Sequence, residues 1–383
     1  MSAPTIPIAR PVMGDREAEA AARVIRSGWV TQGPEVAAFE EEFATFVGAE
    51  HAVAVSSCTT ALHLALLGVG VGAGDEVVTV SHSYIATANA VTYCGATPVF
   101  VDVERATFNM DPTLVEAAIT DRTRAILCVH QIGMACDVEA LHRIAERHGL
   151  PLVEDAACAA GSSLRIGDDW QQVGRPHSEV ACFSFHPRKV MSTGDGGMLT
   201  TDDAELAARF RLLRQHGMSV NDRARHGSST VVFEEHGVIG FNYRLTDIQA
   251  AVGRVQLEQL PEIVDQRRTA AHRYHAALSS VVGVTPPFEA DDRRSNWQSY
   301  AVTLDDGLDQ RTIMQGMLDR GIATRRGIMC AHRETPYRVE GFSLPASEHS
   351  QDQVVLLPLF PQLTEAEIDR VVTELAAVVG ASR

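Results

Sequence analysis

The sequence lacks the features that mark several specialised classes of protein. No run of about 18 or more apolar residues occurs, so there is no candidate transmembrane helix. Its first residues, MSAPTIPIARPVMG, lack the charged and apolar regions of a secretory signal peptide. No CxxC or HExxH spacing indicates a metal site. The seven cysteines are isolated and odd in number, as in a reduced cytosolic protein. We therefore expect a cytoplasmic protein with no metal and no membrane contact.

Basic residues are scarce relative to acidic ones. The chain has 33 Lys and Arg against 49 Asp and Glu, which gives a formal net charge of −16. Nucleic acids and anionic membranes are bound by basic surfaces, so neither is expected as a partner. A small anionic substrate is compatible with this balance, because one pocket can carry the sign opposite to that of the whole chain.

The residues that are present suffice for two domains. The 383 residues exceed one ordinary domain, and 45% of them are hydrophobic. From residue 48 to 201, short apolar runs alternate with helical periods, which predicts a mostly parallel sheet covered by helices. After the two prolines at 286 and 287 the pattern changes. We expect a large α/β domain over residues 1–250 and a smaller C-terminal α+β domain over residues 251–383.

Individual elements follow from the same periodicities. Strands are expected over residues 76–80, 98–103, 124–129, 151–154, 180–185, 198–201 and 297–304. Helices are expected over residues 59–69, 86–93, 137–148, 204–216, 246–279, 310–321 and 365–379. Residues 217–241 have no clear period and are expected to form a long loop, which is often a functional element.

Four clusters of polar residues lie at the ends of predicted strands, where open α/β sheets bind their ligands. The first is Ser-Ser-Cys-Thr-Thr-Ala over residues 56–61, at the turn from a strand to a helix. Hydroxyl groups and free backbone N–H groups at a helix N-terminus suit a phosphate. The alternative is an ordinary helix N-cap.

The second cluster begins at Asp155, directly after the predicted strand 151–154. Small residues follow it, in the sequence Ala-Ala-Cys-Ala-Ala-Gly, and they would let a flat molecule lie close to the chain. A carboxylate at this place could keep a ring nitrogen protonated by pairing with its charge. The alternative is an aspartate that caps a helix.

The third cluster centres on Lys189, four residues after a buried strand and shortly before the glycine turn 194–197. A lysine in a partly desolvated pocket is expected to have a lowered pKa, so that its neutral amine can attack an aldehyde and shuttle protons. A lysine considered alone is usually a surface residue. The fourth cluster, residues 240–247, offers Asn242 and Arg244 to phosphate or carboxylate groups, or else simply starts a helix.

In order and spacing the four clusters resemble the fold-type-I enzymes that use pyridoxal 5′-phosphate (PLP), specifically the DegT/StrS family of nucleotide-sugar and aminocyclitol aminotransferases. The similarity extends from about Gly14 to Val379. Its most specific part is FSFHPRK followed by TGDGG, and SSCTTALHLAL, EDAACAAGS and GFNYRLTDIQAAVGRVQLEQL support it. The resemblance implies a large PLP-binding domain with a mostly parallel sheet, a smaller α+β domain, and a homodimer with shared active sites.

The resemblance also implies roles for single residues. Lys189 would form a Schiff base with PLP and move protons, and Asp155 would pair with the pyridine nitrogen. Further cofactor contacts implied by the family are Cys58, Thr59, Tyr84, Cys158, Ser184 and Asn242. The phosphate would be held by Cys58, Thr59 and Ser184, and by Asn242 of the neighbouring subunit. Tyr84 would stack on the ring, or else be a packing residue. Cys158 departs from the family, which commonly has Gln or His beside the cofactor's phenolic oxygen.

The implied reaction takes an amino group from glutamate or glutamine, holds it as pyridoxamine 5′-phosphate, and passes it to a keto-sugar, expected to be nucleotide-linked. A keto-cyclitol acceptor is the first alternative. A PLP- or pyridoxamine phosphate-dependent sugar dehydratase is the second, and Lys189 argues against it. Candidate substrate contacts are His186, Arg325 and His332, which could equally be exposed surface residues. We expect the loop segment Arg223–His226 to help close over the acceptor.

Overall fold

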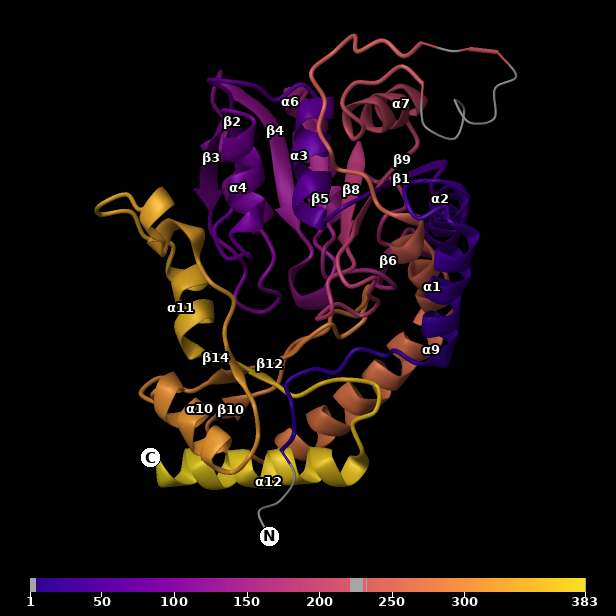
Figure 1. Ribbon diagram of the computed structural model, residues 1–383. Helices are drawn as coiled ribbons and strands as arrows, with labels where there is room; N and C mark the ends of the chain where they lie inside the picture. The colour runs from indigo at the N-terminus through magenta and orange to yellow at the C-terminus, as the bar shows by residue number, and fades with distance from the viewer. Residues whose placement is uncertain (1–4, 221–229, 232, 383) are drawn as a thin grey trace.

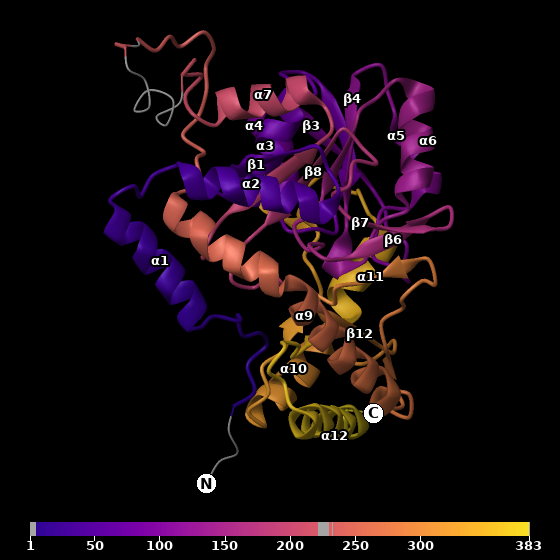
Figure 2. The same ribbon diagram turned by 90° about the vertical axis from the view of Figure 1, so that its right-hand side faces the viewer.

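The computed structural model describes residues 5–220, 230–231 and 233–382. Within these residues the chain forms a large α/β body and a smaller α+β body, which lie one above the other in Figure 1. Figure 2 shows the long helix α9 (Asp247–Leu278) running from the large body into the small one.

Seven strands form the central sheet of the large body, in the order β1, β9, β8, β5, β4, β2, β3. They are β1 (His51–Val55), β2 (Glu76–Val80), β3 (Thr97–Val101), β4 (Thr123–Val129), β5 (Leu152–Asp155), β8 (Val180–Ser184) and β9 (Gly197–Thr201). Every pair from β8 across to β3 is parallel, whereas β9 is antiparallel to both of its neighbours. The predicted mostly parallel sheet is confirmed.

Helices cover both faces of the sheet, because its strands carry apolar side chains on both sides. One face packs against α3 (Cys58–Gly68), α4 (Ala86–Tyr93) and α7 (Ala204–Leu213). The other packs against α2 (Pro34–Val47), α6 (Val138–His148) and the first half of α9. Alternate residues of β1 serve the two cores: Val53 and Val55 belong to the first, Ala52 and Ala54 to the second.

The small body contains a four-stranded antiparallel sheet in the order β10, β12, β14, β13. Its elements are β10 (Val284–Thr285), β12 (Tyr300–Leu304), α10 (Gln310–Asp319), β13 (Arg325–Arg326), α11 (Pro345–Gln353), β14 (Val354–Leu357) and α12 (Glu365–Ala381). The N-terminal segment joins this body, because Ile6 is buried in its core and pairs with Ile322.

The remaining elements connect or flank the two bodies. They are α1 (Asp15–Ser27), α5 (Val115–Ala118), the 3₁₀ helices η1 (Pro112–Leu114), η2 (Gln131–Gly133), η3 (Ala331–Arg333) and η4 (Thr335–Tyr337), and the sheet of β11 (Arg293–Arg294), β6 (Ser163–Ile166) and β7 (Asp169–Gln172). The predicted boundary between residues 250 and 251 falls in the first turn of α9, which contributes to both cores: Leu260 belongs to the large one and Tyr274 to the small one.

The largest differences from the predicted bounds occur in two elements, each of which is shorter by three residues (297 to 300 and 213 to 216). The strand predicted over 297–304 begins at Tyr300, because Trp297 has a φ of 51° that an extended strand cannot contain. The helix predicted over 204–216 ends at Leu213, since the chain turns at His216, where φ is 64°. In both cases a backbone turn interrupts an apolar pattern that continues in the sequence.

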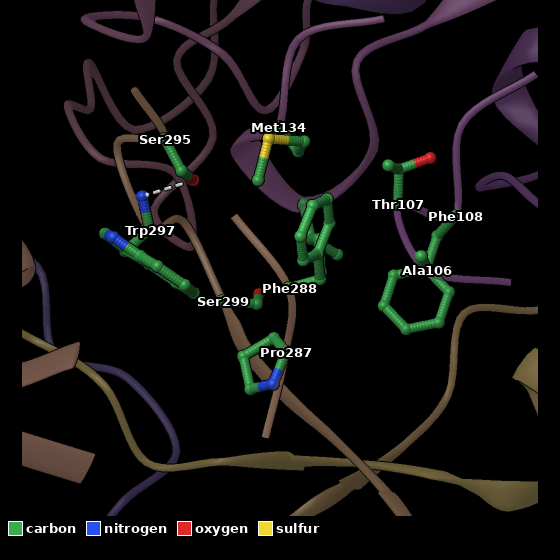
Figure 3. Close-up of a pocket in the computed structure, with 10 residues that line it drawn as sticks. Ala106, Thr107, Phe108, Met134, Pro287, Phe288, Ser295, Trp297 and Ser299 are labelled. Carbon is green, nitrogen blue, oxygen red and sulfur yellow. Dashed lines mark hydrogen bonds between the residues drawn. The ribbon is translucent and has the colours of Figure 1, made fainter. Parts of the chain in front are cut away.

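A small cavity lies at the joint between the two bodies, as Figure 3 shows. Phe108, Ile132 and Trp297 line it, and all three have positive φ angles of 63°, 50° and 51°. Bulky side chains rarely adopt this conformation. The cavity measures about 10 Å³, room for one water molecule at most, so it is no substrate pocket.

Candidate active site

Most of the predicted site residues lie just beyond the carboxyl ends of the central strands. Asp155 ends β5, Ser184 ends β8, and Cys58 starts the helix that follows β1. Tyr84 lies between β2 and α4, and Lys189 lies in the turn between β8 and β9. The parallel strands bring these ends to one edge of the sheet, as expected for this architecture.

Lys189 is half-buried and its amine points at a thiol. Its Nζ donates a hydrogen bond to Sγ of Cys158 over 3.0 Å. The backbone turn is fixed by the Lys189 N–H, which donates to the carbonyl of His186 over 2.8 Å. The amide of Gln298 donates to the carbonyl of Arg188 over 3.1 Å, so a residue near β12 also supports this turn.

The electrostatic environment of Lys189 differs from the expected one. Burial lowers the pKa of Lys189, but the contact with Cys158 and the charge of Asp155 raise it, and the net pKa lies above the ordinary lysine value. The predicted lowered pKa is therefore wrong for the polypeptide alone. The sequence pattern predicted the desolvation, and the resemblance placed Asp155 and Cys158 in the same site, but their effect on the pKa of the amine was not part of the prediction.

The composition of the chain contains a further indication that Lys189 is functional. Lys189 is the only lysine in the chain, and every other residue among the 33 Lys and Arg is an arginine. Any chemistry in this protein that needs a lysine amine must therefore use this residue. A count of residue types alone would have found it.

Asp155 is buried and 4% exposed. Its Oδ2 accepts a hydrogen bond from Oγ1 of Thr87 over 2.7 Å, and its Oδ1 accepts one from the N–H of Ala157 over 3.1 Å. Burial raises the pKa of Asp155, the bonds from Thr87 and Ala157 and the charge of Lys189 lower it, and the net pKa is raised. The alternative of a helix N-cap does not apply, because no helix follows β5 directly within the described residues.

The N-terminus of α3 is the place at which the sequence predicts an anion site. Ser57 caps the helix by accepting from the N–H of Thr60 over 3.2 Å, while the N–H groups of Cys58 and Thr59 have no partner within the helix. Burial raises the pKa of the Cys58 thiol well above its ordinary value, so it is neutral. Its Sγ lies 3.6 Å from the carbonyl oxygen of Cys182, which brings this turn to the end of β8.

Gly197 shows why the glycine turn follows Lys189. A Cβ atom at this position would lie 2.5 Å from the carbonyl carbon and oxygen of Ser57 and 2.7 Å from the nitrogen of Cys58. Only glycine therefore allows β9 to pass this close to the start of α3. The glycine turn and the hydroxyl-rich turn therefore lie directly against each other, although Ser57 and Gly197 are far apart in the sequence.

The other predicted cofactor contacts differ in how accessible they are to a ligand. The side chain of Tyr84 is 71% exposed and is free to contact a ligand, whereas Ser184 is buried. Asn242 is exposed, between Phe241 and Tyr243, whose rings stack at 4.8 Å. The Tyr243 hydroxyl lies 3.1 Å from Nδ1 of His63, so the two aromatic rings fasten this segment to α3 and leave Asn242 at the surface.

The three candidate substrate contacts lie in different surroundings. His332 is buried, with Nδ1 2.6 Å from Oγ of Ser81 and Nε2 3.2 Å from Oε1 of Glu348. A contact between His332 and a substrate would require one of these hydrogen bonds to break. His186 is half-buried and its Nδ1 accepts from the N–H of Arg188.

Arg325 lies on β13 and is exposed. Burial of part of the side chain and the positive charge of Arg188 lower the pKa of Arg325. The two cations are therefore neighbours, next to the turn that carries Lys189. The loop residues Arg223–His226 lie outside the described residues. Among the residues that are described, no group of three or more His, Cys, Asp or Glu could hold a metal ion, and no helix could span a membrane.

This set of residues fits PLP. An aldehyde needs an amine, an aromatic ring nitrogen needs a buried acid, and a phosphate needs free N–H groups at a helix N-terminus. Lys189, Asp155 and the start of α3 supply these three groups at one edge of the sheet. The fold and the site together define a PLP-dependent aminotransferase.

The chain belongs to the DegT/DnrJ/EryC1/StrS aminotransferase family, whose model matches residues 11–376. It is similar to S. venezuelae DesV, with 36% identity, a TM-score of 0.88, and coverage of 98% of this chain and 99% of that one. DesI, solved with its TDP-sugar product, has 31% identity, a TM-score of 0.88 and coverage of 98% and 93%. Spr1654 from Streptococcus pneumoniae, solved in a pyridoxamine phosphate form, has 27% identity, a TM-score of 0.92 and coverage of 99% and 100%.

Proposed function

We propose that this enzyme transfers an amino group from glutamate or glutamine to a nucleotide-linked keto-sugar. The observation that carries the proposal is the placement of one lysine amine and one buried carboxylate at the same sheet edge as a phosphate-binding helix start. When bound, PLP would supply an electron-withdrawing ring that stabilises negative charge on the substrate carbon.

Each residue of the site would have a separate role in this reaction. Lys189 anchors the aldehyde and then moves a proton at the substrate carbon with Nζ, next to the thiol of Cys158. Asp155 holds a proton on the ring nitrogen through its charge. The N–H groups of Cys58 and Thr59, together with Ser184, hold the phosphate. The exposed ring of Tyr84 covers one face of the cofactor.

The nucleotide-linked acceptor is supported by the neighbouring cations Arg188 and Arg325 beside Lys189. Phosphate groups are bound well by guanidinium groups, whereas a keto-cyclitol has no phosphate to bind. The similarity to DesI, solved with a TDP-sugar product, points to the same class of acceptor.

We also propose that the active form is a cytoplasmic homodimer. Phe233 and Ile239 are 85% and 89% exposed and lie in the same long connection as Asn242. Apolar side chains this exposed, beside a polar side chain held at the surface, suit a protein interface. A second copy would cover them, and its Asn242 would complete the phosphate site. The seven free cysteines suit a reducing compartment.

The function is tested by offering donors and acceptors separately. Glutamate and glutamine are each added to the PLP form, and loss of the visible absorbance band identifies the donor. The resulting pyridoxamine form is then mixed with a nucleotide-linked keto-sugar, the same sugar without its nucleotide, and a keto-cyclitol. Return of the band with the nucleotide-linked sugar alone is the expected result. Return only with the keto-cyclitol would contradict the proposal.

Two adjacent arginines provide a matched test of acceptor binding. Successive side chains of a strand point in opposite directions, so Arg325 and Arg326 on β13 face different surroundings. We expect Arg325→Ala to raise the KM for the acceptor about tenfold or more, by loss of a charged hydrogen bond. Arg326→Ala should leave this KM unchanged. Equal effects of the two variants would remove Arg325 from the acceptor site.

A further inference from the structure

Three buried oxygen-bearing side chains form a chain that ends on Asp155. Oγ of Ser83 lies 2.7 Å from Oγ1 of Thr87, which lies 2.7 Å from Oδ2 of Asp155. The three residues are 4%, 1% and 4% exposed, so bulk water does not compete for these bonds. Hydrogen bonds in a medium of low polarity are stronger and polarise one another.

The direction of the chain is fixed by counting hydrogens. Each hydroxyl carries one hydrogen, and Thr87 donates its own to the Asp155 carboxylate. The bond between Ser83 and Thr87 must therefore have Ser83 as donor. Both hydroxyl dipoles then point their positive ends toward the carboxylate, so each of them favours the charged form of Asp155.

The hydrogen bond from Thr87 matters because burial and the polar contacts of Asp155 act on its pKa in opposite directions. Burial works against the carboxylate and raises the pKa of Asp155, whereas Thr87 is the first of the groups that lower it. The other groups that lower it are the Ala157 N–H and the charges of Lys189 and His130. Without the Thr87 hydroxyl, one carboxylate oxygen would be buried with no donor, and such a charge prefers to take up a proton.

We propose that Thr87, oriented by Ser83, is a positioning residue that keeps Asp155 ionised and aimed at the cofactor ring. The proposal rests on the role proposed above for Asp155. A protonated Asp155 would have no charge with which to retain a proton on a pyridine nitrogen. A carboxylate free to rotate would lose the direction of its pairing.

The hydrogen-bonded chain from Ser83 through Thr87 to Asp155, here called the relay, has a second consequence because of its position. Ser83 and Thr87 enclose Tyr84, the exposed aromatic residue, within one five-residue segment at the end of β2 and the start of α4. The carbonyl of His82, directly before this segment, accepts a hydrogen bond from the side-chain amide of Gln131. One short segment thus sets both the acid at the edge of the ring and the aromatic residue offered to its face.

Four variants separate this role from a merely structural one. Thr87→Val removes the hydroxyl and keeps the shape, Thr87→Ser restores the hydroxyl, and Ser83→Ala removes only the second donor. The matched control is Thr79→Val, because Thr79 is also fully buried but donates to the carbonyl of Leu127, over 2.8 Å, and not to Asp155.

Two measurements other than turnover are made on each full-length protein. The first is the dissociation constant of PLP from the apoenzyme, and the second is the pH dependence of the absorbance of bound PLP. We expect Thr87→Val to weaken PLP binding roughly ten- to hundredfold, as for a lost hydrogen bond to a charged group. It should also shift the pH-dependent absorbance change. Ser83→Ala should act in the same direction but less, Thr87→Ser should resemble the native protein, and Thr79→Val should change neither measurement.

Asp155→Asn makes failure of this proposal distinguishable from failure of the proposed function. If Asp155→Asn impairs PLP binding while Thr87→Val leaves both measurements unchanged, the relay is wrong and the role of Asp155 stands. If Thr87→Ser behaves like Thr87→Val, or Thr79→Val behaves like Thr87→Val, the effect is one of packing and the relay is again wrong. If Asp155→Asn binds PLP like the native protein with an unchanged spectrum, the site assignment itself fails.

Discussion

At the scale of single residues, the sequence predicted which residues form the site more easily than it predicted their charge. Lys189 stands out in the sequence through its place after a buried strand and before a glycine turn. Its raised pKa depends on Cys158 and Asp155, which lie at and just after the end of β5. The family resemblance implied that these residues share one cofactor site, but their closeness to the amine follows only from the folded arrangement. The same holds for Thr87, whose partner is 68 residues away.

The assignment of Lys189 can be tested by chemical trapping. Borohydride reduction of the PLP-loaded protein should fix one cofactor per chain, and the modified peptide should contain residue 189, the only lysine. Lys189→Ala and Lys189→Arg should trap none and should lose at least about 10²–10⁴-fold in turnover, the contribution typical of a general acid–base group. Intact-protein mass spectrometry gives the first result. Trapping in either variant would overturn the assignment.

The charge of Lys189 can be measured directly, because labelled lysine would give one side-chain NMR signal per chain. In the apoenzyme we expect this signal to titrate above the ordinary lysine pKa, and Cys158→Ala to move the titration downward, since a partner that raises the pKa is lost. A group with a raised folded pKa stabilises the fold below its unfolded pKa, and that stabilisation is lost as pH rises through the folded value. Titration below the ordinary value would show that desolvation dominates.

At the scale of elements, segments long enough to show a hydrophobic period were predicted well, and shorter segments were not. The strand over 76–80 and the helix over 86–93 agree with β2 and α4 residue for residue. By contrast, β11 and β13 have two residues each, too few for any period to appear in the sequence. Their pairing with β6 and β14 depends on partners far along the chain. The antiparallel direction of β9 likewise depends on its neighbours and not on its own pattern.

One ion pair at the end of α7 provides a stability test. Arg214 donates to Glu40 and to the carbonyl of Ala54, the latter over 2.6 Å, and the two charged side chains are only 5% and 11% exposed. Removing one partner leaves a buried charge unpaired, so Arg214→Ala should lower the free energy of unfolding by about 3–5 kcal/mol. Arg211→Ala is the control, because Arg211 is 3.9 Å from Glu40 and 40% exposed. Its loss should cost less than about 1 kcal/mol.

Urea unfolding of both variants measures this difference. Equal stabilities of Arg214→Ala and Arg211→Ala would show that the buried pair contributes nothing.

At the scale of the whole molecule, shared active sites can be tested by mixing subunits. Lys189→Ala removes the amine that we propose to be catalytic, and Asn242→Asp would place a negative charge where we propose that the neighbouring subunit binds the cofactor phosphate. Each variant alone should be nearly inactive. A random mixture of the two chains should recover about a quarter of native activity, because half of the dimers are mixed and each of these has one intact site.

The mixture is made by co-expression, and light scattering confirms the dimer. Activity of the mixture that equals the sum of the two separate variants would show that Asn242 serves only its own subunit. The sequence could suggest this arrangement through resemblance alone, because a single chain does not contain the contact.

The pairing of Ile6 with the small body has a consequence for the newly made chain. The N–H of Ile6 donates to the carbonyl of Gly321, and the carbonyl of Ile6 accepts from Ala323. Ile322, its bridge partner, is synthesised 316 residues later (322 − 6). At ribosomal rates of roughly 5–20 residues per second, Ile6 waits about 15–60 s for its partner. During that interval the side chain of Ile6 lacks the core that buries it in the folded protein, so chaperones that bind apolar segments can hold this part of the nascent chain.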